Sequence, residues 1–171
     1  DTIFLSGSLT ENGYVRGTIS VEKVLSSTGS YNFGNIGATI SVNGLVPETT
    51  RVLRFTGNIP PGFGTADAMK RYYQITSSQN FDSVNLNLKY DVTRELNSQS
   101  ENRVTIWKGN SDGTSWVRQT RSVVNSTSHS VQLNGITSFS LWAISSNHLK
   151  TLVADGDWSE SQNWIPKSLP T

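Results

Sequence analysis

Residues 84–91 read Val-Asn-Leu-Asn-Leu-Lys-Tyr-Asp, with apolar and polar side chains alternating without a break. A period of two puts Val84, Leu86 and Leu88 on one face of a β-strand and their polar neighbours on the other, whereas a helix would scatter both sets around its circumference. We therefore predict a half-buried antiparallel strand, with one face on a core and the other in water.

The rest of the chain repeats this pattern in short stretches bounded by turn residues. The further strand candidates are residues 2–5, 14–25, 38–43, 51–56, 71–76, 102–108, 115–121, 128–133 and 138–144. About ten short strands without a convincing helix predict an all-β fold, an antiparallel β-sandwich of immunoglobulin-like or jelly-roll-like type. The structural alternative is part of a parallel β-solenoid, although no fixed-period repeat stands out.

Two turn signals predict hairpins in the second half of the chain. Asp112-Gly113, within the turn segment 109–114, separates two strand candidates, and Asn134-Gly135 separates the next two. Such pairs between apolar runs favour tight antiparallel connections. Residues 138–144 are apolar on both faces, which predicts a central strand rather than an edge strand.

The composition excludes several classes of partner and chemistry. The chain of 171 residues has 14 basic and 13 acidic residues, so it presents no electrostatic case for nucleic acid. It has no cysteine, which removes disulfides and thiolate chemistry. No apolar run reaches the roughly 20 residues that span a bilayer, so we expect no membrane insertion. Low charge with abundant small polar residues is typical of secreted β-proteins.

Several short motifs together resemble a known kind of module. They are residues 17–21 (Gly-Thr-Ile-Ser-Val), 31–37 (Tyr-Asn-Phe-Gly-Asn-Ile-Gly), 71–76 (Arg-Tyr-Tyr-Gln-Ile-Thr), 95–97 (Glu-Leu-Asn), 104–108 (Val-Thr-Ile-Trp-Lys) and 136–142 (Ile-Thr-Ser-Phe-Ser-Leu-Trp). In this order they resemble a β-sandwich module of large secreted and cell-surface proteins of Bacteroidetes. The resemblance implies type IX secretion and a multidomain, adhesin-like or polysaccharide-acting parent protein. It carries no catalytic signature.

We predict a division of the chain at its last strong strand. Residues 1–153 form the sandwich module, with the alternative that 1–12 are the end of a preceding module. Residues 154–171 form a linker or the start of a following module, because 156–164 (Gly-Asp-Trp-Ser-Glu-Ser-Gln-Asn-Trp) resemble the opening of another module in such chains.

Candidate catalytic motifs are few. Gly109-Asn110-Ser111-Asp112-Gly113 matches the Gly-x-Ser-x-Gly pattern of a nucleophile elbow, which requires a strand–turn–helix context. Strand candidates flank it on both sides, so we interpret it as a hairpin turn. No local pair of carboxylates suggests a glycosidase. His129 and His148, the two histidines, lack spaced partner ligands and are interpreted as surface residues. We therefore predict that the chain is not an enzyme and has no catalytic or metal-binding residues.

One acidic connection is the candidate for a cation. Asp91, Glu95, Asn97 and Glu101 supply oxygen ligands along residues 91–101, and calcium takes six to eight such ligands. The alternative is a solvated loop whose side chains cap backbone groups. Residues 155–159 echo the start of an EF-hand loop, but the later glycine and glutamate are missing. We expect no cofactor, with calcium as the exception to test.

Aromatic side chains offer the remaining candidate for a binding surface, although the ligand-binding residues stay unknown. The residues to weigh are Trp107, Trp116, Trp142, Tyr72, Tyr73 and Tyr90. Exposed coplanar rings stack on sugars, whereas buried rings fill a core or stabilise hairpins. Core packing is the favoured interpretation, and Trp107 and Trp116 are expected to pack across one hairpin.

These observations lead to one leading hypothesis and one alternative. The leading hypothesis is a non-catalytic structural or adhesive module of a large secreted or surface protein, located outside the cell or on its surface. The alternative is a carbohydrate-binding module attached to a polysaccharide-active enzyme. The expected partners are neighbouring modules of the same polypeptide, and surface glycans or polysaccharide under the alternative.

Overall fold

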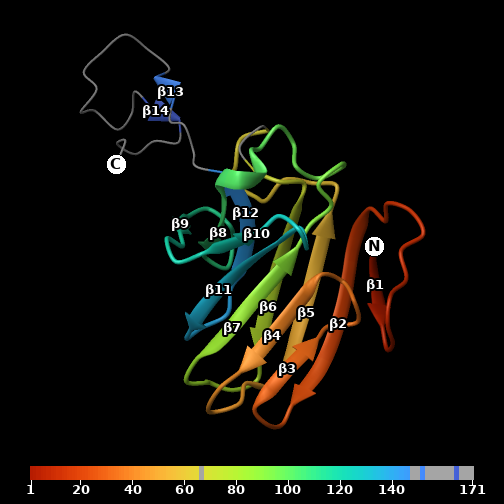
Figure 1. The fold of residues 1–171 in the computed structure, drawn as a ribbon. Coiled ribbons are helices and arrows are strands. Elements are labelled where there is room, and N and C mark those ends of the chain that lie inside the picture. Colours follow the sequence, from red (N-terminus) through yellow and green to blue (C-terminus); the bar gives the residue numbers. More distant parts are fainter. Residues whose placement is uncertain (66–67, 147–150, 153–163, 166–171) are drawn as a thin grey trace.

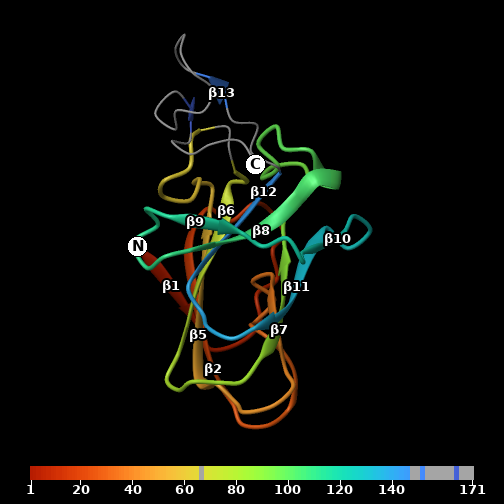
Figure 2. The same ribbon diagram turned by 90° about the vertical axis from the view of Figure 1, so that its left-hand side faces the viewer.

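The computed structural model describes residues 1–65, 68–146, 151–152 and 164–165. Two β-sheets pack face to face as a β-sandwich (Figure 1). Viewed from the side, β2 and β5 lie in one layer and β7 and β11 in the other (Figure 2). The predicted all-β sandwich is confirmed. The solenoid alternative is wrong, because nearly all strand pairs of the two sheets are antiparallel.

The first sheet has seven strands in the order β1-β2-β5-β6-β12-β8-β9. Their bounds are β1 Thr2–Leu5, β2 Gly17–Leu25, β5 Glu48–Thr56, β6 Arg71–Ser77, β12 Leu141–Ser146, β8 Val104–Gly109 and β9 Trp116–Arg118. The prediction of a central strand near residues 138–144 is confirmed, since β12 lies between β6 and β8. The hairpin at 109–114 is also confirmed, because it joins the antiparallel pair β8 and β9.

The second sheet has five strands in the order β10-β11-β7-β4-β3. Their bounds are β10 Val123–Asn125, β11 Ser130–Ile136, β7 Val84–Lys89, β4 Ala38–Val42 and β3 Gly29–Asn32. A short 3-10 helix, η1, covers Glu101–Arg103, and β13 Thr151–Leu152 pairs with β14 Trp164–Ile165. In the described residues, no helix is long and apolar enough to cross a membrane.

The alternating strand β7 lies at the centre of the second sheet and builds much of the core. Val84, Leu86 and Leu88 are fully buried, as predicted, and Leu86 lies opposite Ile40 on β4 and Leu133 on β11. The first sheet faces them with another buried set, which includes Ile19, Val21, Val52, Ile75, Trp142 and Ile144. Each such aliphatic side chain contributes roughly 1.5–3 kcal/mol when fully buried.

The predicted hairpin at Asn134-Gly135 is wrong. Both residues belong to β11, where the pairing register with β7 shifts between Leu133 and Ile136 and Gly135 adopts a φ of +70°. A glycine with positive φ serves a bulge as well as a turn. The chain then passes to the first sheet, where β12 pairs with β6 and β8, so β11 and β12 lie in different layers.

The strand β1 lies at one edge of the first sheet and pairs with β2 in parallel, from Thr2 opposite Thr18 to Leu5 opposite Val21. Consecutive parallel strands need a crossover connection. Residues 6–16 supply it and bring Glu11 to one end of the sandwich. Residues 1–12, for which a preceding module was an alternative, thus contribute to this sheet. Most of 154–171 lies outside the described residues, so that boundary stays a prediction.

Candidate functional site: a polar cluster at one end of the sandwich

Charged side chains enter the sandwich from two neighbouring strands of the first sheet. On β5, Arg54 is two residues from the buried Val52, and on β6, Arg71 is two residues from the buried Tyr73. A period of two directs such pairs to the same face, so both arginines point inward. Arg54 is 0% exposed and Arg71 is 6% exposed. A buried guanidinium requires a partner, because leaving it unpaired is costly.

Arg54 finds its partner in the crossover connection. Its Nη1 and Nη2 donate to the two carboxylate oxygens of Glu11 at 2.9 and 2.7 Å. The paired, two-bond geometry is among the strong forms of ion pair. The Glu11 side chain is 26% exposed, so the pair lies at the boundary between core and solvent. This contact ties residues 6–16 to β5.

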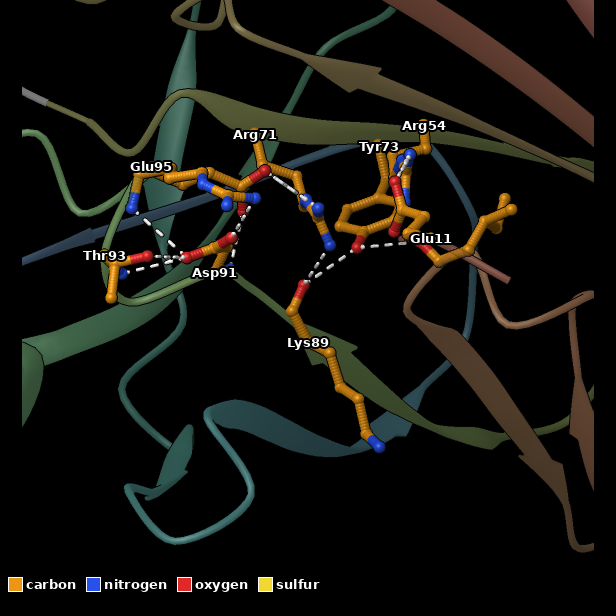
Figure 3. Close-up of polar contacts among 10 residues, drawn as sticks. Glu11, Arg54, Arg71, Tyr73, Lys89, Asp91, Thr93 and Glu95 are labelled. Atoms are coloured by element: carbon orange, nitrogen blue, oxygen red, sulfur yellow. Dashed lines mark hydrogen bonds and ion pairs between the residues drawn. The ribbon is translucent and has the colours of Figure 1, made fainter. Parts of the chain in front are cut away.

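Arg71 pairs with Glu95, on the connection that follows β7 (Figure 3). The Arg71 Nε and Nη2 atoms lie 2.9 and 2.8 Å from Glu95 Oε1. The second oxygen, Oε2, accepts the backbone N–H of Asp91 at 2.7 Å. Both oxygens of this fully buried carboxylate therefore have a donor.

Burial opposes the charged form of both members of this pair, and their neighbours counteract it to different extents. Burial raises the pKa of the Glu95 carboxyl, while Arg71 and the Asp91 N–H act against that rise. Burial also works against the charged form of Arg71, but Tyr73 and Glu95 raise the pKa of Arg71 above its ordinary value. A buried ion pair of this kind has to be complete, because removing one partner leaves the other charge uncompensated.

Tyr73 connects this pair to the second sheet. Its hydroxyl donates to the Lys89 carbonyl at 2.9 Å and lies 3.3 Å from the Ile36 carbonyl. Arg71 Nη1 donates to the same Lys89 oxygen at 3.3 Å (Figure 3). Gly37 leaves the room that this arrangement needs, since a Cβ there would lie 2.6 Å from the Tyr73 hydroxyl oxygen. The cluster therefore fastens the two layers to each other at this end.

Asp91 organises the turn that begins the 91–101 connection. Its Oδ1 accepts the Thr93 N–H at 2.9 Å, the Thr93 hydroxyl at 2.6 Å and the Arg94 N–H at 3.2 Å. Although partial burial works in the opposite direction, these donors lower the pKa of Asp91. This is the backbone capping that short acidic side chains provide in turns.

Glu101 links the end of the same connection to the residue that precedes β11. Its Oε1 accepts the Tyr90 hydroxyl at 2.9 Å and lies 2.7 Å from His129 Nδ1. The hydrogen bond from His129, followed by that from Tyr90, lowers the pKa of Glu101. The His129 side chain is 43% exposed, as expected for a surface histidine, but this partner was not predicted.

An open hollow of about 490 Å³ lies over the cluster. Residues of the crossover connection and of the segment after β7 line it, together with Arg71 of β6 and His129, which precedes β11. The lining includes Glu11, Tyr14, Arg71, Asp91, Arg94 and His129. The hollow is rich in charge, but the carboxylates that reach it already accept hydrogen bonds from side chains or backbone of the same chain.

The predicted calcium ligands do not converge on one point. Asp91 and Glu95 bond to the turn and to Arg71, while Glu101 bonds to Tyr90 and His129. Asn97 turns its amide nitrogen to the carbonyls of Thr65 and Ala68, at 2.8 and 2.9 Å. Among the residues that the structure describes, no group of three or more His, Asp or Glu side chains could hold a metal ion.

The other sequence candidates lie apart from this cluster. Ser111 lies in the turn between β8 and β9, with a strand on each side rather than the helix that a nucleophile elbow requires. Of the aromatic residues weighed, Trp142, Tyr73 and Tyr90 are buried in the core. His148 and residues 155–159 lie outside the described residues.

The remaining aromatics are partly exposed, and their rings contact other rings. Tyr72 stacks on Phe55, with centroids 4.4 Å apart and an interplanar angle of 5°. Trp107 and Trp116 both meet Phe63 edge-on, at 5.9 and 5.0 Å. Phe63 thus contacts both tryptophans of the hairpin, a contact that the sequence of the hairpin could not indicate.

Sequence reasoning found Asp91, Glu95 and Glu101 but missed Glu11, Arg54, Arg71 and Tyr73. The sequence did contain a sign of these partners. Arg54 and Arg71 alternate in step with the apolar residues of their strands, at positions that face the core, where a charged side chain implies a buried partner. Comparisons with protein-family models, curated proteins and solved structures find no match for this chain.

Proposed function

We propose that this chain is a non-catalytic structural or adhesive module of a larger extracellular protein. The observation that carries the proposal is the internal pairing of the charged groups at the polar end. Glu11 and Glu95 each neutralise a buried arginine, and Glu101 bonds to Tyr90 and His129. A catalytic acid or base needs a proton-transfer position that faces a substrate. These carboxylates instead face groups of their own chain.

The contacts support a mechanical role for the cluster. The Glu11–Arg54 pair holds the crossover connection, and the Glu95–Arg71 pair holds the 91–101 connection. The hydroxyl of Tyr73 adds hydrogen bonds across the two layers. Loops held in this way keep a sandwich end rigid, which suits a spacer or a platform for neighbouring modules of the same polypeptide.

Hydrolysis assays test the proposal. The wild-type protein should not release nitrophenol from nitrophenyl glycosides or esters faster than buffer does, and E11Q, E95Q and E101Q should change only stability. The proposal fails if the wild type hydrolyses a substrate and one of these variants, assayed at a temperature where it is still folded, loses that activity.

Carbohydrate binding is the second candidate function. The stacked pair Phe55–Tyr72 gives it weak support. The two rings stack on each other across neighbouring strands, so the faces that meet are not free to stack on a sugar. The observation that favours it is an uncharged hollow elsewhere on the molecule, lined by hydroxyl and amide side chains. In either case, we propose that the module acts outside the cell or at its surface.

A further inference from the structure

The geometry points to a binding site for a neutral sugar residue in a second hollow, at the far end of β6. This inference rests on carbohydrate binding, the second of the two proposed functions. The hollow has a volume of about 340 Å³, near the lower end of the ~300–1,000 Å³ typical of ligand sites. It lies where β6 ends, whereas the polar cluster lies where β6 begins with Arg71.

The hollow arises because β6 extends beyond the end of its neighbour β12. The last pair of residues between β6 and β12 is Gln74 with Leu141, and the last backbone bond runs from Ile75 N to the Ser140 carbonyl at 2.9 Å. Thr76 still pairs with Arg51 of β5 on its other side. The open notch is bordered by residues 77–81, by residues 137–140 and by Ser111 of the β8–β9 turn.

The polar lining of this hollow carries no charge. Its side chains are amides and hydroxyls from the end of β6 and the two bordering segments. The lining side chains that make no hydrogen bond to another described residue are those of Gln74, Thr76, Gln79, Asn80, Ser111 and Thr137. Amides and hydroxyls both donate and accept hydrogen bonds, as sugar hydroxyls do. They therefore complement a neutral polyol better than an ion.

This lining differs from that of the hollow over the polar cluster. There, the charged groups bond to one another and stabilise the fold. Here, the serine hydroxyls of residues 77, 138 and 140 bond within the protein, whereas the other amide and hydroxyl side chains have no partner among the described residues. A cation contacts the lining from outside, since Lys108 Nζ donates to Ser138 Oγ. Lys108 also lies over the ring of Trp142, 5.4 Å from its centroid. That ammonium is engaged within the protein and does not line the hollow.

An apolar wall accompanies the polar groups. The rings of Phe81 and Phe139 lie 4.4 Å apart at an angle of 39°, and both residues line the hollow with Leu141. Phe81 is 8% exposed and Leu141 is 6% exposed, so they form the floor, while Phe139 is only partly buried. A pyranose has C–H groups on one face and hydroxyls around its rim. An apolar wall of two phenylalanines and a leucine beside amides and hydroxyls suits both features, and it requires no exposed ring face.

Nuclear magnetic resonance titration of the nitrogen-15-labelled chain tests the site. The probes are glucose, galactose, mannose and N-acetylglucosamine, with galacturonate as a charged comparison. We expect at least one neutral sugar to shift the side-chain amide signals of Gln74, Gln79 and Asn80, with a dissociation constant on the order of 1 mM for a single residue. The double variant Q74A/N80A should weaken binding by about tenfold or more.

The matched control is Q132A, which removes an amide on β11, outside the hollow. It should bind the sugar as the wild type does. The inference is overturned if no neutral sugar shifts these signals, if galacturonate alone binds, or if Q74A/N80A and Q132A have equal effects. Such results leave the structural proposal intact, because that proposal depends on the hydrolysis assays and on the polar cluster.

Discussion

The Arg54 guanidinium and the Glu11 carboxylate form two hydrogen bonds across 43 positions of sequence, at 2.9 and 2.7 Å. The arginine is fully buried, and the glutamate comes from the connection that crosses the end of the sandwich. The parallel strand β1 has only β2 as its neighbour in the sheet, and its residues are mostly exposed. This ion pair is therefore expected to govern how firmly the N-terminal strand is held.

E11A should destabilise the fold by roughly 3–5 kcal/mol, because it leaves a buried guanidinium without its partner. Urea unfolding measures the loss, and hydrogen exchange should show that amides of β1 lose protection first. The matched control is E22A, which breaks the exposed pair of Glu22 with Arg51, whose side chains are 51% and 50% exposed. That variant should cost no more than about 1 kcal/mol. Equal effects of the two variants would contradict the assigned role.

The sequence predicted the parts of the fold that local alternation determines. The strand predicted at residues 84–91 is present, although it ends at Lys89, and its buried face is correct, because Val84, Leu86 and Leu88 all point into the core. The prediction failed at Asn134-Gly135, because a glycine with positive φ fits a bulge as well as a turn. Which of the two forms depends on the partner strand β7, which is far away in sequence.

The site was only half predictable for a related reason. Asp91, Glu95 and Glu101 stand close together in sequence, so their acidic character was visible. Their partners Arg71 and His129 lie 24 and 28 residues away from Glu95 and Glu101, respectively. Pairing at that distance depends on the order of strands in the two sheets. The sequence therefore leaves both a cation site and a loop with capping side chains open, and the fold supplies these carboxylates with protein donors.

Gly37 gives a prediction about close packing at the cluster. Its φ is +92°, and an added Cβ would lie 2.6 Å from the Tyr73 hydroxyl oxygen and 3.1 Å from Arg71 Nη1. G37A should therefore cost at least the ~1–3 kcal/mol of a strained backbone, measured by urea unfolding. Gly7 has open space around it and no positive φ, so G7A serves as the control and should be nearly neutral. A neutral G37A would mean that the two layers are not tightly joined there.

Glu101 gives a prediction about pH. Its pKa in the folded protein is lowered from its ordinary value of 4.5, first by His129 and then by Tyr90. The contribution of this carboxylate to stability is therefore present above that ordinary value and is lost as the pH falls through the folded pKa. The wild type should exceed E101Q in urea midpoint at neutral pH, and the difference should shrink below about pH 4.5. A difference that stays constant down to strongly acidic pH would contradict this linkage.

Calcium gives a prediction about metal removal. Because Asp91, Glu95, Asn97 and Glu101 bond to separate partners, added calcium or a chelator should leave the melting temperature unchanged. Differential scanning fluorimetry in calcium chloride and in EDTA measures this. Binding to the folded state alone would raise stability with ligand concentration. A melting temperature that rises with calcium would therefore restore the cation hypothesis.

A double-mutant cycle on Arg71 and Glu95 tests most directly the claim that the polar cluster is a structural clamp. Urea unfolding at neutral pH is measured for the wild type, R71M, E95Q and R71M/E95Q. Each single variant should cost roughly 3–5 kcal/mol, because it leaves one buried charge unpaired. The double variant should cost less than the sum, with a coupling of at least about 1 kcal/mol. Small and additive losses would show that the pair does not hold the fold, and would contradict the account.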